Sequence, residues 1–280
     1  MKTADLITHA HLSPSSEAVA LAVALAAEAG WRLVADEEEF EKHGAAAEGI
    51  GRRTDADRPD LCIVLGGDGS ILHALRRYAG TPVPVFGVNF GTVGFLAAVD
   101  RGEAAAGIER ALAGETETIE LPGLEVSWGG ETGLGFNDIT LSRRPHDRVA
   151  ELSYRIAGEE VGHVRCDGLV AATPAGSTGY NLANQGPILA WGVKGYVVSY
   201  IAPHSLTARA LVVAPADVLH VGNAAEREPV EVAVDGNRFA ELRSGESLEV
   251  RFVDRAGRLA QLPGTSFYQR IREKFGHLAV

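Results

Sequence analysis

The sequence predicts an α/β domain with a Rossmann-like parallel sheet, followed by an all-β, sandwich-like domain and a final helix. In the first part, short apolar segments alternate with helical segments, which is the pattern of βαβ units. After about residue 119, short strand-like segments dominate and are separated by glycine, proline or polar turns. We therefore expect an α/β domain over 1–118, a β domain over 119–262 and a helix within 263–280.

The composition is that of an enzyme-sized globular protein. The 280 residues are 46% hydrophobic and 22% charged, so the chain can bury its own core. A net charge of −11 argues against non-specific binding to nucleic acid or to anionic membranes. Because the N-terminus lacks signal-peptide features and no segment reaches membrane-spanning length, we expect a cytoplasmic protein. Cys62 and Cys166 lie far apart and are expected to be reduced core thiols.

The first part reads as strands and helices in turn. Pro14, Ser15 and Ser16 open the first helix, and Gly30 ends it. The acidic run 36–41 is interpreted as a solvated helix start or a loop rather than as a metal site. The predicted elements are a strand over 4–10, a helix over 17–29, strands over 31–35 and 61–65, a helix to about 79, a strand over 83–88 and a helix over 101–113.

A glycine loop follows the apolar strand 61–65 and has the sequence Gly66-Gly67-Asp68-Gly69-Ser70. Glycines let a ligand approach the backbone closely, and the N-terminus of the next helix offers unpaired N–H groups to an anion. We expect Ser70 to cap that helix. The alternative is a tight turn in which Asp68 and Gly69 serve only the turn. In a parallel sheet, this loop and the one near Asn89 would share the carboxyl edge, where ligands bind.

The second part consists of short predicted strands with one helical insertion. The insertion is expected over 178–184, and the final helix over 265–275 has Phe267, Ile271 and Phe275 on one face. The predicted strands are 124–128, 135–142, 150–156, 161–165, 169–172, 195–201, 211–214, 218–221, 230–234 and 248–253.

Four polar stretches in the second part combine side chains typical of binding sites. Each also has an ordinary structural explanation: an Asx turn, a surface ion pair, a loop that caps a helix, and a hairpin turn. In the same order, the stretches are Asn137-Asp138, Arg165 to Asp167, Thr173 to Tyr180, and Asp235-Gly236-Asn237.

Taken together, in this order and spacing, these stretches resemble the NAD kinase (ATP-NAD kinase) family of the bacterial type. The glycine loop alone is only moderately specific, because related lipid kinases and 6-phosphofructokinases share it. The run Asp167-Gly-Leu-Val-Ala-Ala-Thr-Pro-Ala-Gly-Ser-Thr-Gly-Tyr180 is highly specific. The resemblance covers about residues 60–275 and is supported by Gly186-Pro187-Ile188, by 202–206 and by 234–237.

The resemblance implies transfer of the γ-phosphoryl group of ATP to the 2′-hydroxyl of the adenosine ribose of NAD, giving NADP and ADP. It implies a divalent metal, Mg²⁺, held through the ATP phosphates rather than by protein ligands. It also implies a homodimer or homotetramer, a site in the cleft between the two domains, and a last helix that folds back on the first domain.

The resemblance also implies a set of site residues, with Asp68 as the general base that faces the 2′-hydroxyl. His73 and Ala183 depart from the family pattern, which often has arginine and serine at these positions. The residues expected to bind NAD or ATP are Gly66, Gly67, Gly69, Ser70, His73, Phe95, Asn137, Asp138, Arg148, Arg165, Asp167, Ala175, Thr178, Gly179, Tyr180, Asn181, Leu182, Ala183 and Asn237.

Two other functions are weighed against this one. The first is another kinase of the same superfamily, acting on a lipid or a sugar phosphate; the acidic composition shows no basic, membrane-facing patch that a lipid kinase would favour. The second is a non-catalytic regulator that binds a dinucleotide. The intact glycine loop with Asp68 speaks against the second alternative.

Overall fold

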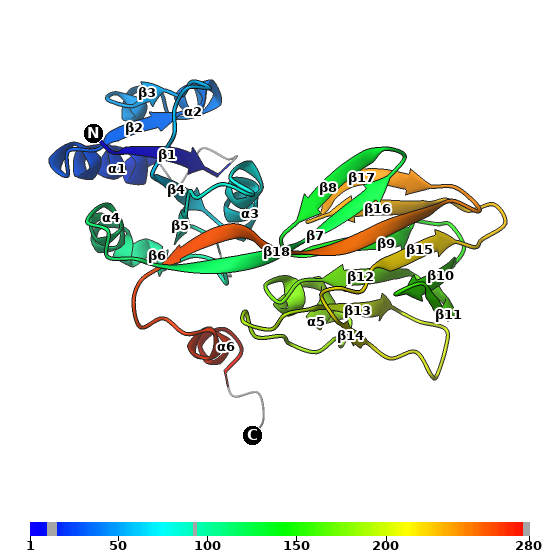
Figure 1. Cartoon of the computed structure of the whole chain (residues 1–280). Helices are drawn as coiled ribbons and strands as arrows, with labels where there is room; N and C mark the ends of the chain where they lie inside the picture. The colour runs from blue at the N-terminus through cyan, green and yellow to red at the C-terminus, as the bar shows by residue number, and fades with distance from the viewer. Residues whose placement is uncertain (10–15, 92–93, 277–280) are drawn as a thin grey trace. The chain divides into compact units, whose positions relative to one another are not determined.

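The computed structural model describes residues 1–9, 16–91 and 94–276, and the chain divides into two compact units (Figure 1). The first unit consists of Met1–Glu120 and Gly257–Val280, and the second consists of Leu121–Ala256. The predicted fold class is confirmed: the first unit is an α/β domain that includes the last helix, and the second is an antiparallel β-sandwich. Residue 10 and residues 14–15, at the predicted end of the first strand and start of the first helix, lie outside the described residues.

The first unit is built on a parallel sheet in the order β5-β4-β1-β2-β3. The end of β18 adds to this sheet by pairing with β5 in parallel. The elements of the unit are β1 (Thr3–Thr8), α1 (Ser16–Glu28), β2 (Arg32–Ala35), α2 (Glu37–His43), β3 (Gly51–Arg52), β4 (Leu61–Gly66), α3 (Asp68–Arg77), β5 (Val85–Asn89), β6 (Val99–Asp100), α4 (Ala104–Leu112) and α6 (Phe267–Phe275).

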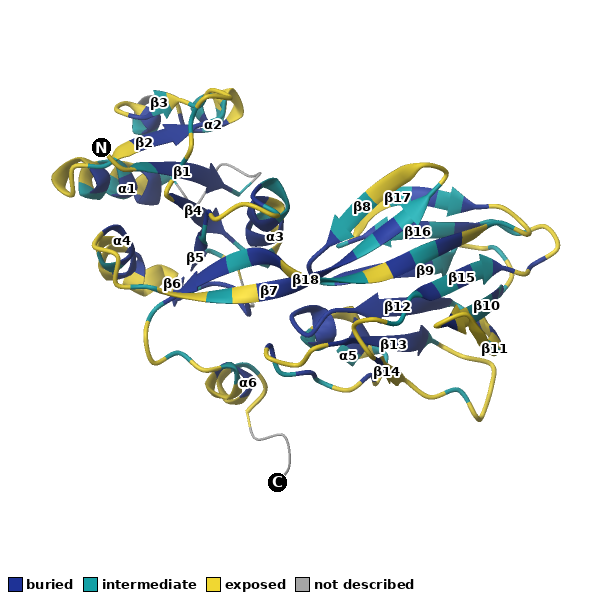
Figure 2. Cartoon of the chain, viewed as in Figure 1, coloured by how far each residue is buried: buried dark blue, intermediate teal, exposed yellow. Residues whose placement is uncertain are grey.

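Both faces of this sheet are covered, which explains why its central strands β4 and β5 are almost entirely apolar. The buried residues of α1 and α4 form one core cluster with residues of β1, β2, β4 and β5. On α3, Ile71 packs so closely on β5 that a Cβ added at Gly87 would lie 2.4 Å from its Cδ1. Figure 2 shows these strands buried along most of their length, with exposed surface on the outer sides of α1 and α4.

The helix after the glycine loop begins at Asp68 with Gly67 at its N-cap, three residues before the predicted cap Ser70. Ser70 therefore lies in the first turn and is not the cap. Its side chain packs on Gly66, where an added Cβ would lie 2.5 Å from the Ser70 Oγ. The close contact of serine and glycine lets the helix begin directly at the end of β4 and places Asp68 in its first turn.

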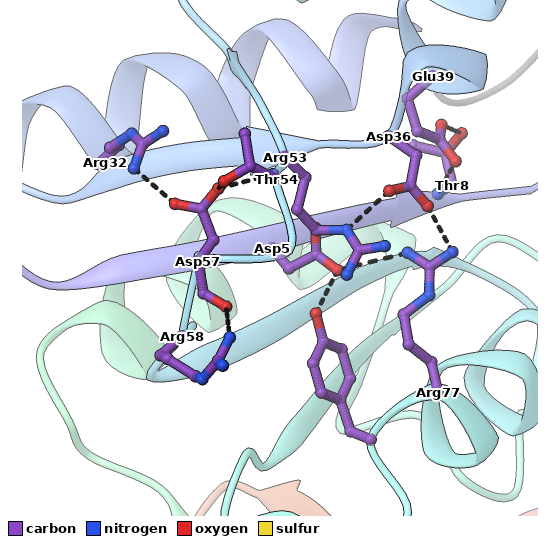
Figure 3. Close-up of polar contacts among 11 residues, drawn as sticks. Asp5, Thr8, Arg32, Asp36, Glu39, Arg53, Thr54, Asp57, Arg58 and Arg77 are labelled. Atoms are coloured by element: carbon purple, nitrogen blue, oxygen red, sulfur yellow. Dashed lines mark hydrogen bonds and ion pairs between the residues drawn. The ribbon is translucent and has the colours of Figure 1, made fainter.

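The acidic run 36–41 is in large part the helix start that the sequence predicts: α2 begins at Glu37, and Glu37, Glu38 and Glu41 are exposed. Glu39 is the exception, since it is buried and its carboxylate accepts hydrogen bonds from the hydroxyl of Thr8 at 2.5 Å and from the Thr8 amide at 3.2 Å. Asp36 pairs with Arg53 at 2.7 Å and also with Arg77 (Figure 3). These partners come from β1, from the segment after β3 and from α3, so a pattern of acidic residues alone does not reveal them.

Asp5 lies at the centre of this polar network and is fully buried in β1. Its carboxylate accepts the hydroxyl of Tyr78 at 2.5 Å, and Arg77 and Arg53 approach it within 3.6 Å and 4.0 Å (Figure 3). Burial raises the pKa of Asp5, whereas the Tyr78 hydroxyl and the two arginines lower it. On balance the pKa of Asp5 is raised, so these partners from several elements offset the burial of the acid only in part.

The second unit packs two antiparallel sheets, in the orders β14-β13-β12-β9-β16-β17 and β11-β10-β15-β18. Their facing residues form one large core cluster. The elements of the unit are β7 (Glu117–Trp128), β8 (Glu131–Gly135), β9 (Asp138–Arg143), β10 (Ala150–Ile156), β11 (Glu159–Cys166), β12 (Gly168–Ala172), α5 (Tyr180–Ala183), β13 (Tyr196–Ile201), β14 (Leu211–Val213), β15 (Leu219–Asn223), β16 (Val230–Val234), β17 (Asn237–Leu242) and β18 (Ser247–Gln261).

Several details of the second unit differ from the sequence-based prediction. Two strands are longer than predicted, since β7 already begins at Glu117 and β18 continues to Gln261. The strand predicted over 135–142 is divided into β8 and β9, with a break at Phe136 and Asn137. The helix predicted over 178–184 is a 3₁₀ turn over Gly176–Thr178 followed by the short α5. The strand β17 is additional, since its polar and charged residues hide the alternation that marks a strand.

Cys62 and Cys166 are free and buried, which confirms the prediction for both thiols. Burial raises the pKa of Cys166 to about 12, so this thiol stays protonated at neutral pH. Among the described residues, none of the helices has both the length and the apolar character needed to cross a membrane.

We expect Tyr78→Phe to destabilise the first unit. The variant removes the hydroxyl that donates to Asp5, and a buried acceptor that loses its donor costs about 1–3 kcal/mol. The free energy of unfolding, measured by urea denaturation, reports this loss. Tyr268→Phe is the control, since Tyr268 is 73% exposed and a change there should stay within about 0.5 kcal/mol. Equal losses in the two variants would contradict the role given to the Tyr78 hydroxyl.

Candidate active site

Asp68 is held by two backbone amides at the start of α3. Its Oδ2 accepts the N–H of Phe95 at 2.9 Å, and its Oδ1 accepts the N–H of Leu96 at 3.0 Å. Burial raises the pKa of Asp68, while the two amides and the positive charges of Arg270 and Lys274 lower it. The two bonds fix the plane of the carboxylate, and burial makes it a better proton acceptor than an exposed aspartate.

A cavity of about 400 Å³ lies beside the glycine loop, within the first unit. Gly67, Gly69, Ser70 and His73 line it from the N-terminal end of α3, at the carboxyl edge of the parallel sheet. A helix N-terminus offers N–H groups and a partial positive charge to an anion. The predicted residues Gly67, Gly69, Ser70 and His73 therefore share one anion-compatible cavity.

Charged side chains of the same unit line the remainder of this cavity. Lys42 and Arg77 contribute positive charge, and both already contact carboxylates: Lys42 lies 2.9 Å from Glu39, and Arg77 pairs with Asp36. Burial and the positive charges of Arg77, Arg76 and Lys42 lower the pKa of His73, so its imidazole is neutral at pH 7. In the described parts of the chain, no group of three or more His, Cys, Asp or Glu side chains is arranged to hold a metal ion.

In the second unit, Asp235 holds the segment that carries Asn137 and Asp138. Its carboxylate accepts the amides of Phe136 at 3.0 Å, Asn137 at 2.7 Å and Asp138 at 3.2 Å. Asp235 adopts a positive φ of 46° in the hairpin between β16 and β17. The sequence predicts only a turn at Asp235. Its partners lie nearly one hundred residues away, so spacing gives no signal for this contact.

Asp138 is the most strongly perturbed carboxylate of the second unit. It is 8% exposed, and burial together with the negative charge of Asp235 raises the pKa of Asp138 to about 7. At neutral pH this side chain is thus divided between its acid and its carboxylate form, and it can donate or accept a hydrogen bond.

The structure brings the predicted stretch 173–180 directly against Asn137. The hydroxyl of Thr173 donates to the carbonyl of Phe136 at 2.6 Å and accepts the N–H of Gly176 at 3.0 Å. A Cβ added at Gly176 would lie 2.0 Å from the carbonyl oxygen of Asn137, so only glycine fits there. Two stretches that the sequence singles out separately are therefore in direct contact.

Within 173–183 the residues differ sharply in exposure. The buried side chain of Asn181 donates to the carbonyls of Ser177 at 2.9 Å and Pro187 at 3.0 Å, which closes the loop internally. Tyr180 is 44% exposed. Ala175 is buried, Thr178 and Leu182 are half-buried, and Gly179 and Ala183 are exposed. Tyr180 and its exposed neighbours are accordingly accessible to a ligand, whereas the Asn181 side chain is not.

A surface ion pair between Arg165 and Asp167 is the ordinary explanation of this stretch, but the two side chains do not pair with one another. Arg165 pairs with Glu151 of β10 at 3.1 Å, and Asp167 pairs with Arg143 of β9 at 2.6 Å. The sequence gives no signal for Arg143 as the partner of Asp167.

The remaining predicted residues lie in two further places. Arg148 and Arg165 line a cavity of about 480 Å³ in the second unit, together with Arg227 and several glutamates. Asn237 begins β17, and its side-chain amide donates to the carbonyl of Asp235 at 3.2 Å. Phe95 is buried and meets Asp68 through its backbone amide.

Two family models match the chain. The ATP-NAD kinase N-terminal domain matches residues 21–116, and the ATP-NAD kinase C-terminal domain matches residues 136–262. Among curated relatives, the NAD kinase of Syntrophotalea carbinolica is 35% identical over 222 residues and covers 78% of each chain. The NAD kinase of Desulforamulus reducens is 30% identical over 279 residues, which are 98% of this chain and 97% of that relative.

Solved structures share the fold. Yeast NADH kinase complexed with NADH has a TM-score of 0.88 and 22% identity, covering 100% of this chain and 89% of that chain. An NAD kinase from Archaeoglobus fulgidus in complex with ATP has a TM-score of 0.72 and 22% identity, covering 98% of this chain and 97% of that chain.

We expect Asp138→Asn to stabilise the protein more at pH 8 than at pH 5. The pKa of Asp138 is about 7 in the folded chain against an ordinary value of 3.8, so wild-type folding takes up a proton and stability falls as the pH rises between these values. The neutral asparagine removes this loss, and its advantage should grow by an amount on the order of 2 kcal/mol between the two pH values.

Thermal and urea unfolding at both pH values measure this difference. Asp254→Asn is the control, because Asp254 is an exposed carboxylate that pairs with Lys194 at 3.4 Å. An Asp138→Asn advantage that is the same at pH 5 and pH 8 would contradict the raised pKa.

Proposed function

The chain belongs to the NAD kinase family, and we propose that it transfers the γ-phosphoryl group of ATP to the 2′-hydroxyl of the adenosine ribose of NAD, giving NADP and ADP. The observation that carries this proposal is the carboxylate of Asp68. It is fixed by two amides, has a raised pKa and lies in the first turn of the helix whose N-terminus borders an anion-compatible cavity. Phosphoryl transfer to a sugar hydroxyl needs this combination of a proton acceptor and a phosphate site.

The cavity beside the glycine loop is our proposed site for the phosphates of the donor. The amides at the start of α3 would face the phosphate oxygens, and Lys42 and Arg77 would add positive charge from the cavity wall. His73 is neutral at pH 7, so it would contribute a hydrogen bond rather than a charge. Gly66, at the end of β4, would hold the loop against Ser70.

The divalent ion that such a transfer requires fits a place on the donor phosphates better than a protein site. Among the described residues, three carboxylates line the cavity wall, and those of Asp36 and Glu39 already contact Arg53, Arg77, Thr8 and Lys42, which leaves only Glu38. No group of three or more His, Cys, Asp or Glu side chains within 1–9, 16–91 and 94–276 is arranged to hold a metal ion. When bound, Mg²⁺ would neutralise charge on the triphosphate.

Asn137 and Asp138 are proposed to bind ribose hydroxyls of NAD. A side chain with a pKa near 7 can accept or donate a hydrogen bond to a hydroxyl group, and Asp235 holds its backbone in place. The exposed ring of Tyr180 would stack on a base, with Thr178, Gly179, Leu182 and Ala183 beside it and Ala175 below. We assign Arg148 and Arg165 to the phosphates of the dinucleotide and Asp167 to its nicotinamide end. Asn237 would make a further polar contact with the dinucleotide.

In the proposed reaction, the 2′-hydroxyl gives its proton to Asp68 as its oxygen attacks the γ-phosphorus of ATP. One P–O bond forms to the ribose, and the P–O bond to ADP breaks, so ADP leaves with the bonding electron pair. The amides of Phe95 and Leu96 keep the carboxylate in place during the proton transfer. Self-association as a homodimer or homotetramer is a further proposal and rests on the family resemblance.

We expect Asp68→Asn to lower kcat for NADP formation by at least about 10²-fold, because an asparagine cannot accept the proton. The assay contains purified protein, Mg-ATP and NAD, with NADP detected enzymatically. The affinity for NAD, measured by calorimetry, should not change. Asp60→Asn is a matched control, since Asp60 also accepts a backbone amide, from Thr3 at 2.9 Å, but at an exposed site. Turnover of Asp68→Asn close to that of the wild type would exclude Asp68 as the base.

We also expect the enzyme to distinguish the two hydroxyls of the adenosine ribose. An NAD analogue that lacks the 2′-hydroxyl should yield no ADP above the background without acceptor, whereas an analogue that lacks the 3′-hydroxyl should still be phosphorylated at a lower rate. ADP release measured with each analogue reports the difference. Comparable ADP release from the 2′-deoxy analogue would place the transfer on a different hydroxyl.

A further inference from the structure

The backbone segment 95–97 is bonded on both of its sides. Its amide side faces Asp68, through the N–H groups of Phe95 and Leu96. Its carbonyl side faces residues from the end of the chain, which belong to the same compact unit. Because every buried backbone group needs a partner, the carbonyl partners also fix where the two amides point.

Arg270 and Gln261 provide those carbonyl partners. The guanidinium of Arg270 in α6 donates to the carbonyl of Phe95 at 3.0 Å and to that of Ala97. The side-chain amide of Gln261, at the end of β18, donates to the carbonyl of Leu96 at 2.9 Å. Arg270 also donates to the side-chain oxygen of Gln261, so the two residues act as one clamp on 95–97.

The clamp is deeply buried. Arg270 is 5% exposed, Gln261 is 1% exposed, and the three residues of the clamped segment are between 2% and 6% exposed. The ring of Phe95 also packs against that of Phe275 in α6, with 5.3 Å between the ring centroids. A buried guanidinium is costly unless it is well partnered, so its presence here needs a reason beyond packing.

Asp68 is the acid that acts most strongly on this guanidinium. Burial lowers the pKa of Arg270, while the charges of Asp68, Glu273 and Asp100 raise it. In return, the charges that act on the carboxylate of Asp68 are those of Arg270 and Lys274, both on α6. The positive charge of Arg270 therefore acts on Asp68, while its N–H groups donate to the backbone segment that holds Asp68.

We propose that Arg270 is a positioning residue for Asp68: through the carbonyls of 95–97, it fixes the two amides that orient the carboxylate. The proposal rests on the function proposed above, in which Asp68 is the general base. In this role Arg270, which is 5% exposed, acts without contacting the substrate. Its fork of donors joins two carbonyls and Gln261 at once, which lysine cannot reproduce. Its charge also favours the ionised form of Asp68, the form that accepts a proton.

The test uses Arg270→Gln and Arg270→Lys in the full-length chain, each alone and combined with Asp68→Asn. We expect Arg270→Gln to lower kcat about 10- to 100-fold with unchanged NAD affinity, because a small displacement of a reacting group has effects of this size. The acid limb of the pH profile of kcat/KM should move to higher pH in Arg270→Gln, which loses the cation, and stay near the wild-type position in Arg270→Lys.

The combined variants separate positioning from general stability. If Arg270 acts through Asp68, adding Arg270→Gln to Asp68→Asn should cause little further loss of kcat. Arg272→Gln is the control: Arg272 lies on the same helix but is exposed, and its kcat should equal that of the wild type. Losses that multiply, or an acid limb that does not move in Arg270→Gln, would overturn the proposal.

Loss of folding and failure of the proposed function can both be distinguished from failure of the positioning role. If Arg270→Gln shows no cooperative thermal transition, the same double-variant comparison with Arg270→Lys decides, and multiplying losses again overturn the proposal. Near-wild-type turnover of Asp68→Asn alone would reject the proposed base. A strong loss in Asp68→Asn with multiplying effects of Arg270 would reject only the positioning role.

Discussion

A carboxylate that is partly withdrawn from water needs hydrogen-bond donors, and each unit of this chain supplies backbone amides to one such carboxylate. In the first unit, Asp68 gathers the amides of Phe95 and Leu96. In the second, Asp235 gathers three successive amides, which include that of Asp138. Backbone donors are fixed by the fold rather than by flexible side chains, so both carboxylates have defined orientations. The loops that carry these amides must keep the conformation in which the N–H groups point at the carboxylates.

The two carboxylates play different parts. Asp68 is itself the proposed proton acceptor, whereas Asp235 holds the backbone of a second acid, Asp138. Burial raises the pKa of both acids; at Asp68 the two amides and nearby cations oppose this rise, while at Asp138 the negative charge of Asp235 adds to it. Asp138 is therefore kept close to the midpoint of its titration at neutral pH.

The sequence predicts well what depends on neighbours along the chain. The buried strand β4, the glycine loop and strands such as β10 and β16 follow from local apolar patterns and turn residues. Contacts that join distant segments are not visible in such patterns: Asp235 meets Asn137 across 98 residues, and Arg270 meets Phe95 across 175. The burial of Glu39 within the otherwise largely exposed acidic run 36–41 is invisible for the same reason, since its partner Thr8 lies on another element, the strand β1.

The residues that clamp 95–97 have a consequence for how the protein is made. The first unit is discontinuous, because it takes the end of β18 and α6 from the part of the chain that follows the second unit. The second unit lies entirely between the two pieces, so all of its residues are synthesised before the second piece of the first unit. If Arg270 positions Asp68 as proposed, the carboxylate gains its fixed orientation only once α6 has docked. A chain terminated before α6 would then carry the glycine loop without a positioned carboxylate.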